Sequence, residues 1–293
     1  YLVDRVFLGL VGAGIGKMFY DRLLHLGTWG VLVGFFISSL YFALLDCSIG
    51  NGQTLGKRWL KVRLVDVNGK PISFEKALAR YAIFAAPILA YGLKLPETRT
   101  PWVVTAIVFV VVYWIGGSTF YLIVFERQNR QGLHDLASGS YVVYADHEGL
   151  VEFKPVVQLH WLILGSLLVV LTVCAAIFND WSEKQPTMLE FHRDARLPES
   201  MDGVQRAYLR DRLRHGLSGD AKKVVYVDVV RKTKPVSEEA FAHDLATSLL
   251  NADRNLQNYD LVNVRLFYGY DIGIASRWEH REFEQSPSAW RNH

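Results

Sequence analysis

The chain has 293 residues, a formal net charge of +3 and 51% hydrophobic residues. This length can hold two domains, and the hydrophobic share is high for a soluble protein. Composition therefore argues against a chain that is soluble along its whole length.

Apolar stretches without Lys, Arg, Asp or Glu dominate the first 180 residues. Residues 25–45, 101–125 and 155–180 are each long enough for a helix that crosses a hydrocarbon core of about 30 Å. Residues 1–20 and 78–95 contain shorter apolar stretches. Because the chain opens without Met, we expect further residues of the first helix to precede it. The pattern predicts a multi-span α-helical membrane protein with about five transmembrane helices.

Basic residues are unevenly divided between the connections. The connections after the second and fourth predicted spans carry most of them: Lys57, Arg58, Lys61, Arg63, Lys70, Lys76, Arg80, Arg127, Arg130 and Lys154. The opposite connections carry only Lys17, Arg22, Lys94 and Arg99. Since Lys and Arg gather on the cytoplasmic side, five spans would place the tail beyond residue 180 outside the cytoplasm.

Glycines in the first two predicted spans fall at helical spacing. Gly12 and Gly16 lie in the first span, and Gly30 and Gly34 in the second. Small residues four apart let membrane helices approach closely. We expect these pairs to serve helix packing within one chain, with a contact between copies in a homo-oligomer as the alternative.

Two short segments outside the spans have strand character. Residues 61–64 alternate between basic and apolar side chains and run toward the turn dipeptide Asn68-Gly69. Tyr141–Tyr144 is the candidate partner strand. Ser73 is a candidate N-cap for the helix that follows the turn.

The region 182–293 carries equal numbers of basic and acidic residues and differs from the apolar part before it. Its pattern predicts a strand at 223–230, a helix at 238–252 capped by Ser237, and two further strands around a turn at 268–271. This order indicates a soluble α+β domain, which the charge distribution places outside the cytoplasm. The charged stretch 201–215 before it is expected to be helical.

Ionisable groups at membrane depth are costly and are the first candidates for function. Asp4 lies inside the first predicted helix, Asp46 ends the second, and Asp135 follows the fourth. His134 precedes Asp135, but neighbours in sequence usually point apart and no Ser or Cys is tied to them by spacing. Metal motifs such as HExxH or paired cysteines are missing from the sequence. We predict no enzyme activity, no cofactor and no metal.

The stretch "IGNGQTLGKRW" looks like a phosphate-binding loop but lacks its spacing. Arg58 stands where that loop needs a hydroxyl side chain. We interpret the segment as a hinge at the membrane surface that contacts lipid headgroups; its residues are Gly52, Gln53, Gly56, Lys57, Arg58, Lys61 and Arg63. Asp46 or Asp135 is expected to pair with Lys57 or Arg58.

Three segments together resemble one family. "YLVDRVFLGLV", "GQTLGKRWLKVRLVDVNGKPISFEKALARY" and "RQGLHDLASGSYVV" are similar to the RDD family of bacterial membrane proteins. The resemblance covers residues 1–145 and implies that Asp4 and Asp135 are the two aspartates of the family pattern. The arginine of that pattern stands before the first aspartate, so Arg5 does not match it. The resemblance implies a membrane domain in a bacterial inner membrane and does not extend to the region 182–293, which the distribution of basic residues places on the periplasmic side.

Two functions follow from these features. Family membership and a carboxylate within a helix suggest ion or small-solute transport, with Asp4 as the coupling residue. The alternative is a membrane-anchored scaffold or assembly subunit that offers the region 182–293 to protein partners. In both cases we expect membrane lipids as partners and no nucleic acid.

Overall fold

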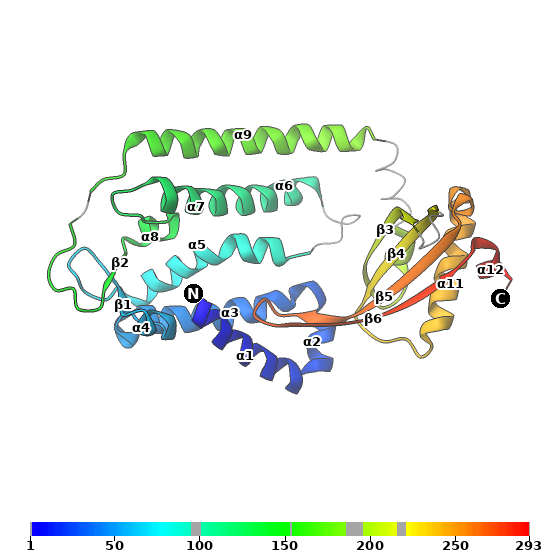
Figure 1. Ribbon diagram of the computed structural model, residues 1–293, viewed down its shortest axis with the longest axis horizontal. Coiled ribbons are helices and arrows are strands. Elements are labelled where there is room, and N and C mark those ends of the chain that lie inside the picture. Colours follow the sequence, from blue (N-terminus) through cyan, green and yellow to red (C-terminus); the bar gives the residue numbers. More distant parts are fainter. Residues whose placement is uncertain (1, 95–100, 153, 186–195, 216–220, 293) are drawn as a thin grey trace.

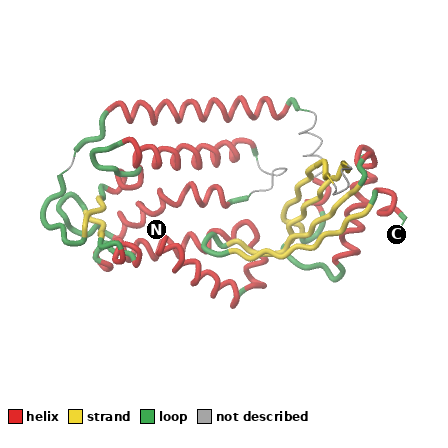
Figure 2. Tube along the Cα trace, viewed as in Figure 1, coloured by secondary structure: helices red, strands yellow, loops and turns green. Residues whose placement is uncertain are grey.

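The computed structural model describes residues 2–94, 101–152, 154–185, 196–215 and 221–292. Helices run along one half of the molecule, and a sheet with its own helices forms the other half (Figures 1 and 2). Short elements close the far end of the helices, opposite the sheet. We call this end the loop end; it holds α4 (Leu55–Trp59), β1 (Val62–Val65), α8 (Leu133–Ser138) and β2 (Tyr141–Tyr144).

Three helices are long and apolar enough to cross a membrane: Tyr20–Asp46, Trp102–Phe125 and Gln158–Trp181. They coincide with the predicted spans 25–45, 101–125 and 155–180. The first is built from α2 (Tyr20–Leu26), a 3-10 turn and α3 (Val31–Asp46). The second joins α6 (Trp102–Val110), a π-helical turn at Val111–Ile115 and α7 (Gly116–Phe125), and the third belongs to α9 (Gln158–Glu183).

The other two predicted spans also form helices, but they do not meet the same criteria within the described residues. Helix α1 (Leu2–Met18) has 17 residues. Helix α5 (Phe74–Gly92) starts at the predicted N-cap, where the Ser73 hydroxyl accepts a hydrogen bond from the Lys76 amide at 3.4 Å. Its first half carries Glu75, Lys76 and Arg80, which lowers its hydropathy. The structure thus shows three candidate spans; the predicted number of five stays a prediction.

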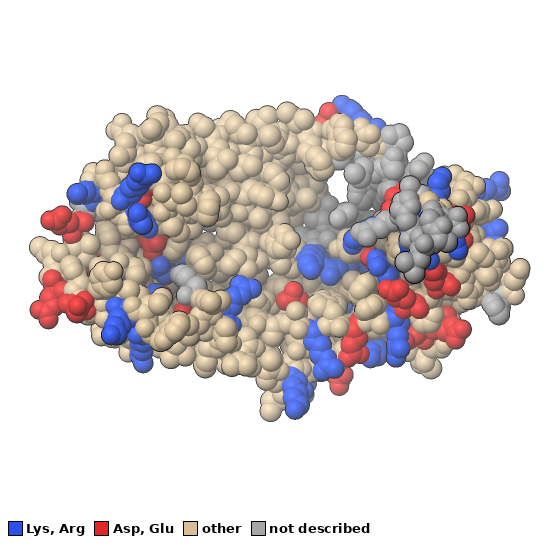
Figure 3. All heavy atoms as spheres, viewed as in Figure 1, with Lys and Arg blue, Asp and Glu red and all other residues tan. Residues whose placement is uncertain are grey.

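The charges follow this division of the molecule. On the face drawn in Figure 3, Lys, Arg, Asp and Glu gather over the loop end and over the sheet domain, while the surface of the helices between them is largely uncharged.

The third candidate span contacts the second through polar atoms. The Trp114 indole donates to the Leu164 carbonyl at 2.9 Å, and the Tyr121 hydroxyl lies 3.0 Å from His160 Nδ1.

The predicted strand pair at the loop end is confirmed. Strands β1 and β2 are antiparallel, with Val62 opposite Tyr144 and Val65 opposite Tyr141. Leu64 and Val65 are fully buried. The pairing therefore ties the segment after the first candidate span to the segment after the second.

The tail forms an α+β domain around a four-stranded mixed sheet in the order β3-β4-β5-β6. Strands β3 and β4 are antiparallel, β4 and β5 parallel, and β5 and β6 antiparallel. Alternate valines of β4 and β5 pack against α11 and α12, with Trp290 at 1% exposure. The elements are β3 (Val204–His215), β4 (Ala221–Arg231), α11 (Glu238–Ala252), β5 (Leu261–Asp271), β6 (Ser276–Gln285) and α12 (Pro287–Arg291).

Two details of the tail differ from the prediction. Residues 204–215 form the edge strand β3 rather than a helix, because they pair along their length with β4, and Val204, Ala207 and Leu209 join the core of the domain. The turn between β5 and β6 lies after Asp271, not at 268–271. Helix α11 begins after Ser237, whose hydroxyl accepts from the Ala240 amide, as predicted.

The tip of the β5–β6 hairpin reaches out of the tail domain and lies against α1 and α3 (Figure 1). Tyr270 and Ile272 are buried in one cluster with Leu23, and Ile274 packs beside them. The glycine pairs lie under this tip. A Cβ atom on Gly12 would stand 2.9 Å from the Ala275 Cβ, and Gly16, Gly30 and Gly34 would meet Tyr270, Asp271 and Ile272.

The glycine pairs therefore do not serve the predicted contact between helices. They leave room for a β-hairpin of the same chain. Its backbone lies against Gly30 and Gly34, and its side chains lie against Gly12 and Gly16. We call the surface formed by Gly12, Gly16, Gly30 and Gly34 the glycine seat.

Candidate functional site

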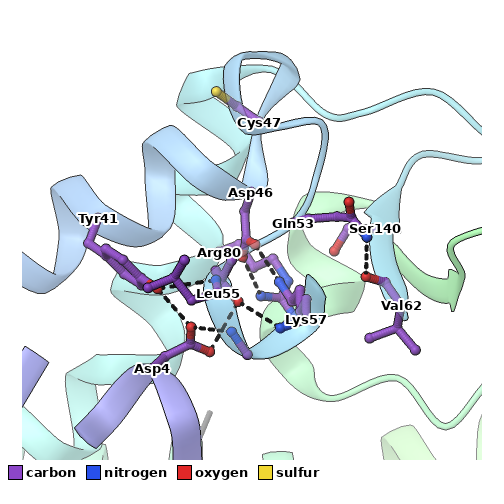
Figure 4. A network of polar contacts seen from close by, with 12 residues as sticks. Asp4, Tyr41, Asp46, Cys47, Gln53, Leu55, Lys57, Val62, Arg80 and Ser140 are labelled. Carbon is purple, nitrogen blue, oxygen red and sulfur yellow. Dashed lines mark hydrogen bonds and ion pairs between the residues drawn. The ribbon is translucent and has the colours of Figure 1, made fainter. Parts of the chain in front are cut away.

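The centre of the loop end is Arg80, which projects from α5 into a buried group of carboxylates (Figure 4). Its Nε and Nη2 donate to Asp135 Oδ1 at 2.9 and 2.6 Å, and its Nη1 lies 3.4 Å from Asp46 Oδ2. Arg80 is 3% exposed and Asp46 1%. One guanidinium thus joins the end of α3 to α8, and its planar fork suits two carboxylates better than an ammonium would.

Lys57 completes this group from the short helix α4. Its ammonium forms an ion pair with Asp46, as Figure 4 shows. Burial lowers the pKa of Lys57, and the negative charge of Asp46 acts in the opposite direction. The predicted pairing of Asp46 with Lys57 is present, whereas Asp135 binds Arg80 rather than Lys57 or Arg58. We call Asp46, Lys57, Arg80 and Asp135 the charge cluster; its two positive and two negative groups balance.

Asp135 also begins helix α8. The Gly132 amide donates to its Oδ2 at 3.0 Å, which caps the first turn. His134 Nε2 lies 3.3 Å from the same oxygen, although sequence neighbours were expected to point apart. Burial lowers the pKa of His134 to about 4, because a protonated imidazole would lose its hydration and face the cations Arg80 and Lys57. His134 is therefore neutral at pH 7.

Asp4 occupies a separate position beside the charge cluster (Figure 4). Its carboxylate accepts hydrogen bonds from the Tyr41 hydroxyl at 2.8 Å, the Thr54 hydroxyl at 3.0 Å and the Gly56 amide at 2.9 Å. Asp4 is 1% exposed. Its acceptor sites are directed at donors of α3 and α4, so Asp4 fixes the start of α1 to the segment that follows α3.

Gly56 shows why this segment needs glycine. A Cβ atom at position 56 would stand 2.6 Å from Asp4 Oδ2 and would displace the carboxylate. Gly52 has a φ of +70°, a conformation that favours glycine, and its own Cβ would meet the Leu64 backbone. The two glycines thus let the chain fold back over Asp4, as the predicted hinge requires.

The remaining hinge residues have different surroundings. Gln53 donates to the Val62 carbonyl at 3.0 Å, and Arg63 donates to the His147 carbonyl at 2.6 Å. Arg58 and Lys61 are exposed. The structure thus leaves Arg58 and Lys61 at the surface and turns Gln53 and Arg63 toward backbone oxygens.

Arg80 is the site residue that sequence reasoning missed. By sequence it belongs to the loop cations that set the orientation, and it also stands inside the motif "EKALARY" just before an apolar stretch. An ionisable residue at the start of such a stretch is a candidate for burial with a partner. That signal could have identified it.

Two of the hollows among the described residues of the membrane part are large enough for a small ligand. One, of about 320 Å³, lies between α1, α3, α5 and the hairpin tip and has mostly apolar walls. The other, of about 410 Å³, lies at the loop end and is lined by polar groups that include Arg127, Asn129, Arg130 and Asp135. Asp4 lines neither of these two hollows.

We expect the protein to lose stability as the pH falls from 6.5 toward 4. The folded protein keeps His134 neutral down to a pKa of about 4, whereas the unfolded chain binds a proton near 6.5. The unfolded state therefore holds more protons in this window, which costs on the order of 3 kcal/mol of stability at its lower end. Melting of the detergent-solubilised protein between pH 7.5 and 4.5 measures the slope.

His134→Asn serves as the test variant and His25→Asn as its control, since His25 is exposed. We expect His134→Asn to flatten the dependence of the melting temperature on pH and His25→Asn to leave it unchanged. Equal slopes in all three proteins would show that His134 does not carry the effect.

The part of the chain that holds this site matches a known protein family. Residues 1–139 match the model of the RDD family. The matched region contains Asp4 and all four residues of the charge cluster, while the tail domain lies outside it. No curated protein and no solved structure matches the chain.

Proposed function

We propose that this chain, an RDD-family membrane protein over residues 1–139, is a scaffold that holds its tail domain in a fixed position at the membrane. The charge cluster and Asp4 join the loop-end segments to helix ends. The glycine seat fixes the tail domain at the other end. The helices between them act as a rigid support.

The docked hairpin is the observation that carries this proposal. A freely tethered domain would need only a linker, yet here Ile272 is fully buried and Tyr270 is 4% exposed against the first helices. Polar contacts reinforce the docking. Gln205 of β3 donates to the Thr28 hydroxyl, and Arg206 donates to the Lys94 carbonyl at 3.2 Å.

The tail domain has a surface suited to a protein partner. We call it the outer sheet face; it is the side of the sheet opposite α11. Arg265 binds Asp228 through two hydrogen bonds of 2.6 and 2.7 Å, and its guanidinium lies 4.5 Å from the Tyr226 ring centre. Phe267 stacks on His280 at 5.7 Å. Arginine and aromatic side chains of this kind are enriched in protein interfaces.

The orientation follows from the basic residues. Among the connections between the predicted spans, Lys and Arg are concentrated at the loop end, so we place this end in the cytoplasm of a bacterium and the tail domain on the periplasmic side of the inner membrane. This arrangement has α1 and α5 cross the membrane with the three longer helices. In it, the outer sheet face is presented to periplasmic proteins.

A photoreactive amino acid placed at Arg210 of the full chain tests the scaffold proposal. The Arg210 side chain is 53% exposed on the outer sheet face. In native membranes we expect a discrete covalent adduct with one protein. The same group at Glu239, which is exposed on α11, is the control and should give no such adduct. No adduct at Arg210, or the same adducts at both positions, would contradict the proposal.

Ion or small-solute transport is the second proposal. The polar hollow of about 410 Å³ beside Asp135 favours it, since it brings the surface of the loop end to a buried carboxylate. The scaffold proposal predicts that proteoliposomes leak protons and sodium no faster than protein-free liposomes, for the natural chain and for Asp4→Asn. A flux above this background that Asp4→Asn abolishes would support transport instead.

A further inference from the structure

The hollow between α1, α3 and α5 has the chemistry of an acyl-chain site. Its volume is about 320 Å³, and its walls include Leu8, Phe35, Phe42, Phe84 and Ile88. Binding pockets for small ligands begin near 300 Å³ and are mostly apolar. The hollow is therefore large enough for a ligand and offers it a hydrocarbon environment.

Other occupants fit this hollow poorly. Water needs two to four polar partners to be held in a cavity, and the walls are mostly aromatic and aliphatic. A protein helix is about 10 to 12 Å across with its side chains and is too wide for a space of this volume. A flexible hydrocarbon chain from the surrounding membrane needs no polar partners and is narrower than a helix.

Polar groups stand at the end of the hollow that points to the loop end. Arg5, Ser38 and Tyr81 line this end, and Arg5 follows Asp4, whose carboxylate binds α4. Arg5 is exposed and has no ion-pair partner among the described residues. The cations of the charge cluster are already paired with Asp46 and Asp135. Arg5 is thus the cation at the hollow that is available to an anion.

The opposite end lies against the tail domain. Asp271, Gly273 and Ile274 of the hairpin tip line the hollow there, together with Gly92 at the end of α5. A mostly apolar space with a cation at one end matches a lipid whose headgroup lies at the cation and whose chain lies along the apolar walls.

We propose that this hollow binds one acyl chain of an anionic phospholipid, with the headgroup phosphate at Arg5 and the chain running along α3 and α5 toward the hairpin tip. The site joins residues of the membrane part and of the tail domain. Its occupancy thus depends on both the cation and the free space, and each can be changed separately.

Native mass spectrometry of the full chain in detergent, with equal amounts of phosphatidylglycerol and phosphatidylcholine added, tests this site. Arg5→Gln should reduce the preference for phosphatidylglycerol about fivefold, because one basic side chain near anionic lipid contributes about 1 kcal/mol. Lys76→Gln is the control, since Lys76 is an exposed cation at the start of α5 that does not line the hollow, and it should keep the preference.

The second variant fills the space. Ile88 is 49% exposed and lines the hollow, so Ile88→Trp should lower the amount of retained lipid of both kinds. Val103→Trp, on the apolar surface of α6 and outside the hollow, should retain lipid as the natural chain does. If Arg5→Gln and Ile88→Trp both bind lipid like the natural chain, the protein holds only annular lipid and the proposal fails.

Discussion

Arg80→Met should lower the melting temperature of the detergent-solubilised protein by about 10 °C. The substitution leaves Asp46 and Asp135 buried without their shared guanidinium, and removal of one partner from a buried ion pair typically costs about 3 to 5 kcal/mol. The melting temperature of Arg80→Lys should lie between those of the natural chain and Arg80→Met, because an ammonium cannot make both of the hydrogen bonds to Asp135. Melting followed by intrinsic tryptophan fluorescence gives the comparison.

Arg58→Met is the control for this experiment, since Arg58 belongs to the same motif and is exposed. It should change stability by no more than about 0.5 kcal/mol. A double variant, Arg80→Met with Asp135→Asn, should recover part of the loss because the uncompensated charge is removed. Equal melting temperatures for Arg80→Met and Arg58→Met would show that the charge cluster does not hold the loop end together.

Gly34→Leu should release the hairpin tip from the helices. A side chain at position 34 overlaps the backbone carbonyl of Ile272, which no rotamer of either residue can relieve. Leucine favours helices more than glycine does, so α3 itself should persist. Hydrogen exchange of the hairpin amides between Tyr270 and Ser276 should accelerate about 10- to 100-fold.

Gly14→Leu is the matched control, because a Cβ atom at position 14 meets nothing within 4 Å. It makes the same chemical change on a helix that carries two residues of the glycine seat. Exchange of the hairpin should stay slow in this variant. If both variants exchange alike, the hairpin is not fixed by its contact with the helices.

The features that the sequence predicted well are those with local signals. Ser73 and Ser237 begin helices because their hydroxyls accept hydrogen bonds from amides three residues later. The pairing of β1 with β2 is predictable because residues 61–64 alternate between basic and apolar side chains and residues 141–144 are all residues that favour strands. Asp4, Asp46 and Asp135 stood out because a carboxylate beside an apolar stretch is costly to bury alone.

The features that were missed depend on contacts between distant segments. The spacing of Gly12 and Gly16 indicates a surface that something approaches closely, but it does not tell whether a helix or a hairpin does so. The stretch 204–215 has many charges and only a few apolar residues, and its neighbour β4 decides that it is a strand. The position of Arg80 before an apolar stretch fits both a cation that sets the membrane orientation and a buried cation. Only its contacts with Asp46 and Asp135 decide between the two.

The docked hairpin also determines when the protein can finish folding. Gly12 and Gly16 leave the ribosome early, whereas Tyr270 and Ala275 are made near the end of translation. Domains generally form in the order of synthesis, so the first helices must enter the membrane with their glycine seat still uncovered. The last step of assembly is then set by arrival of the finished tail domain, and a chain shortened before β5 would keep a bare small-residue surface that other membrane helices could contact.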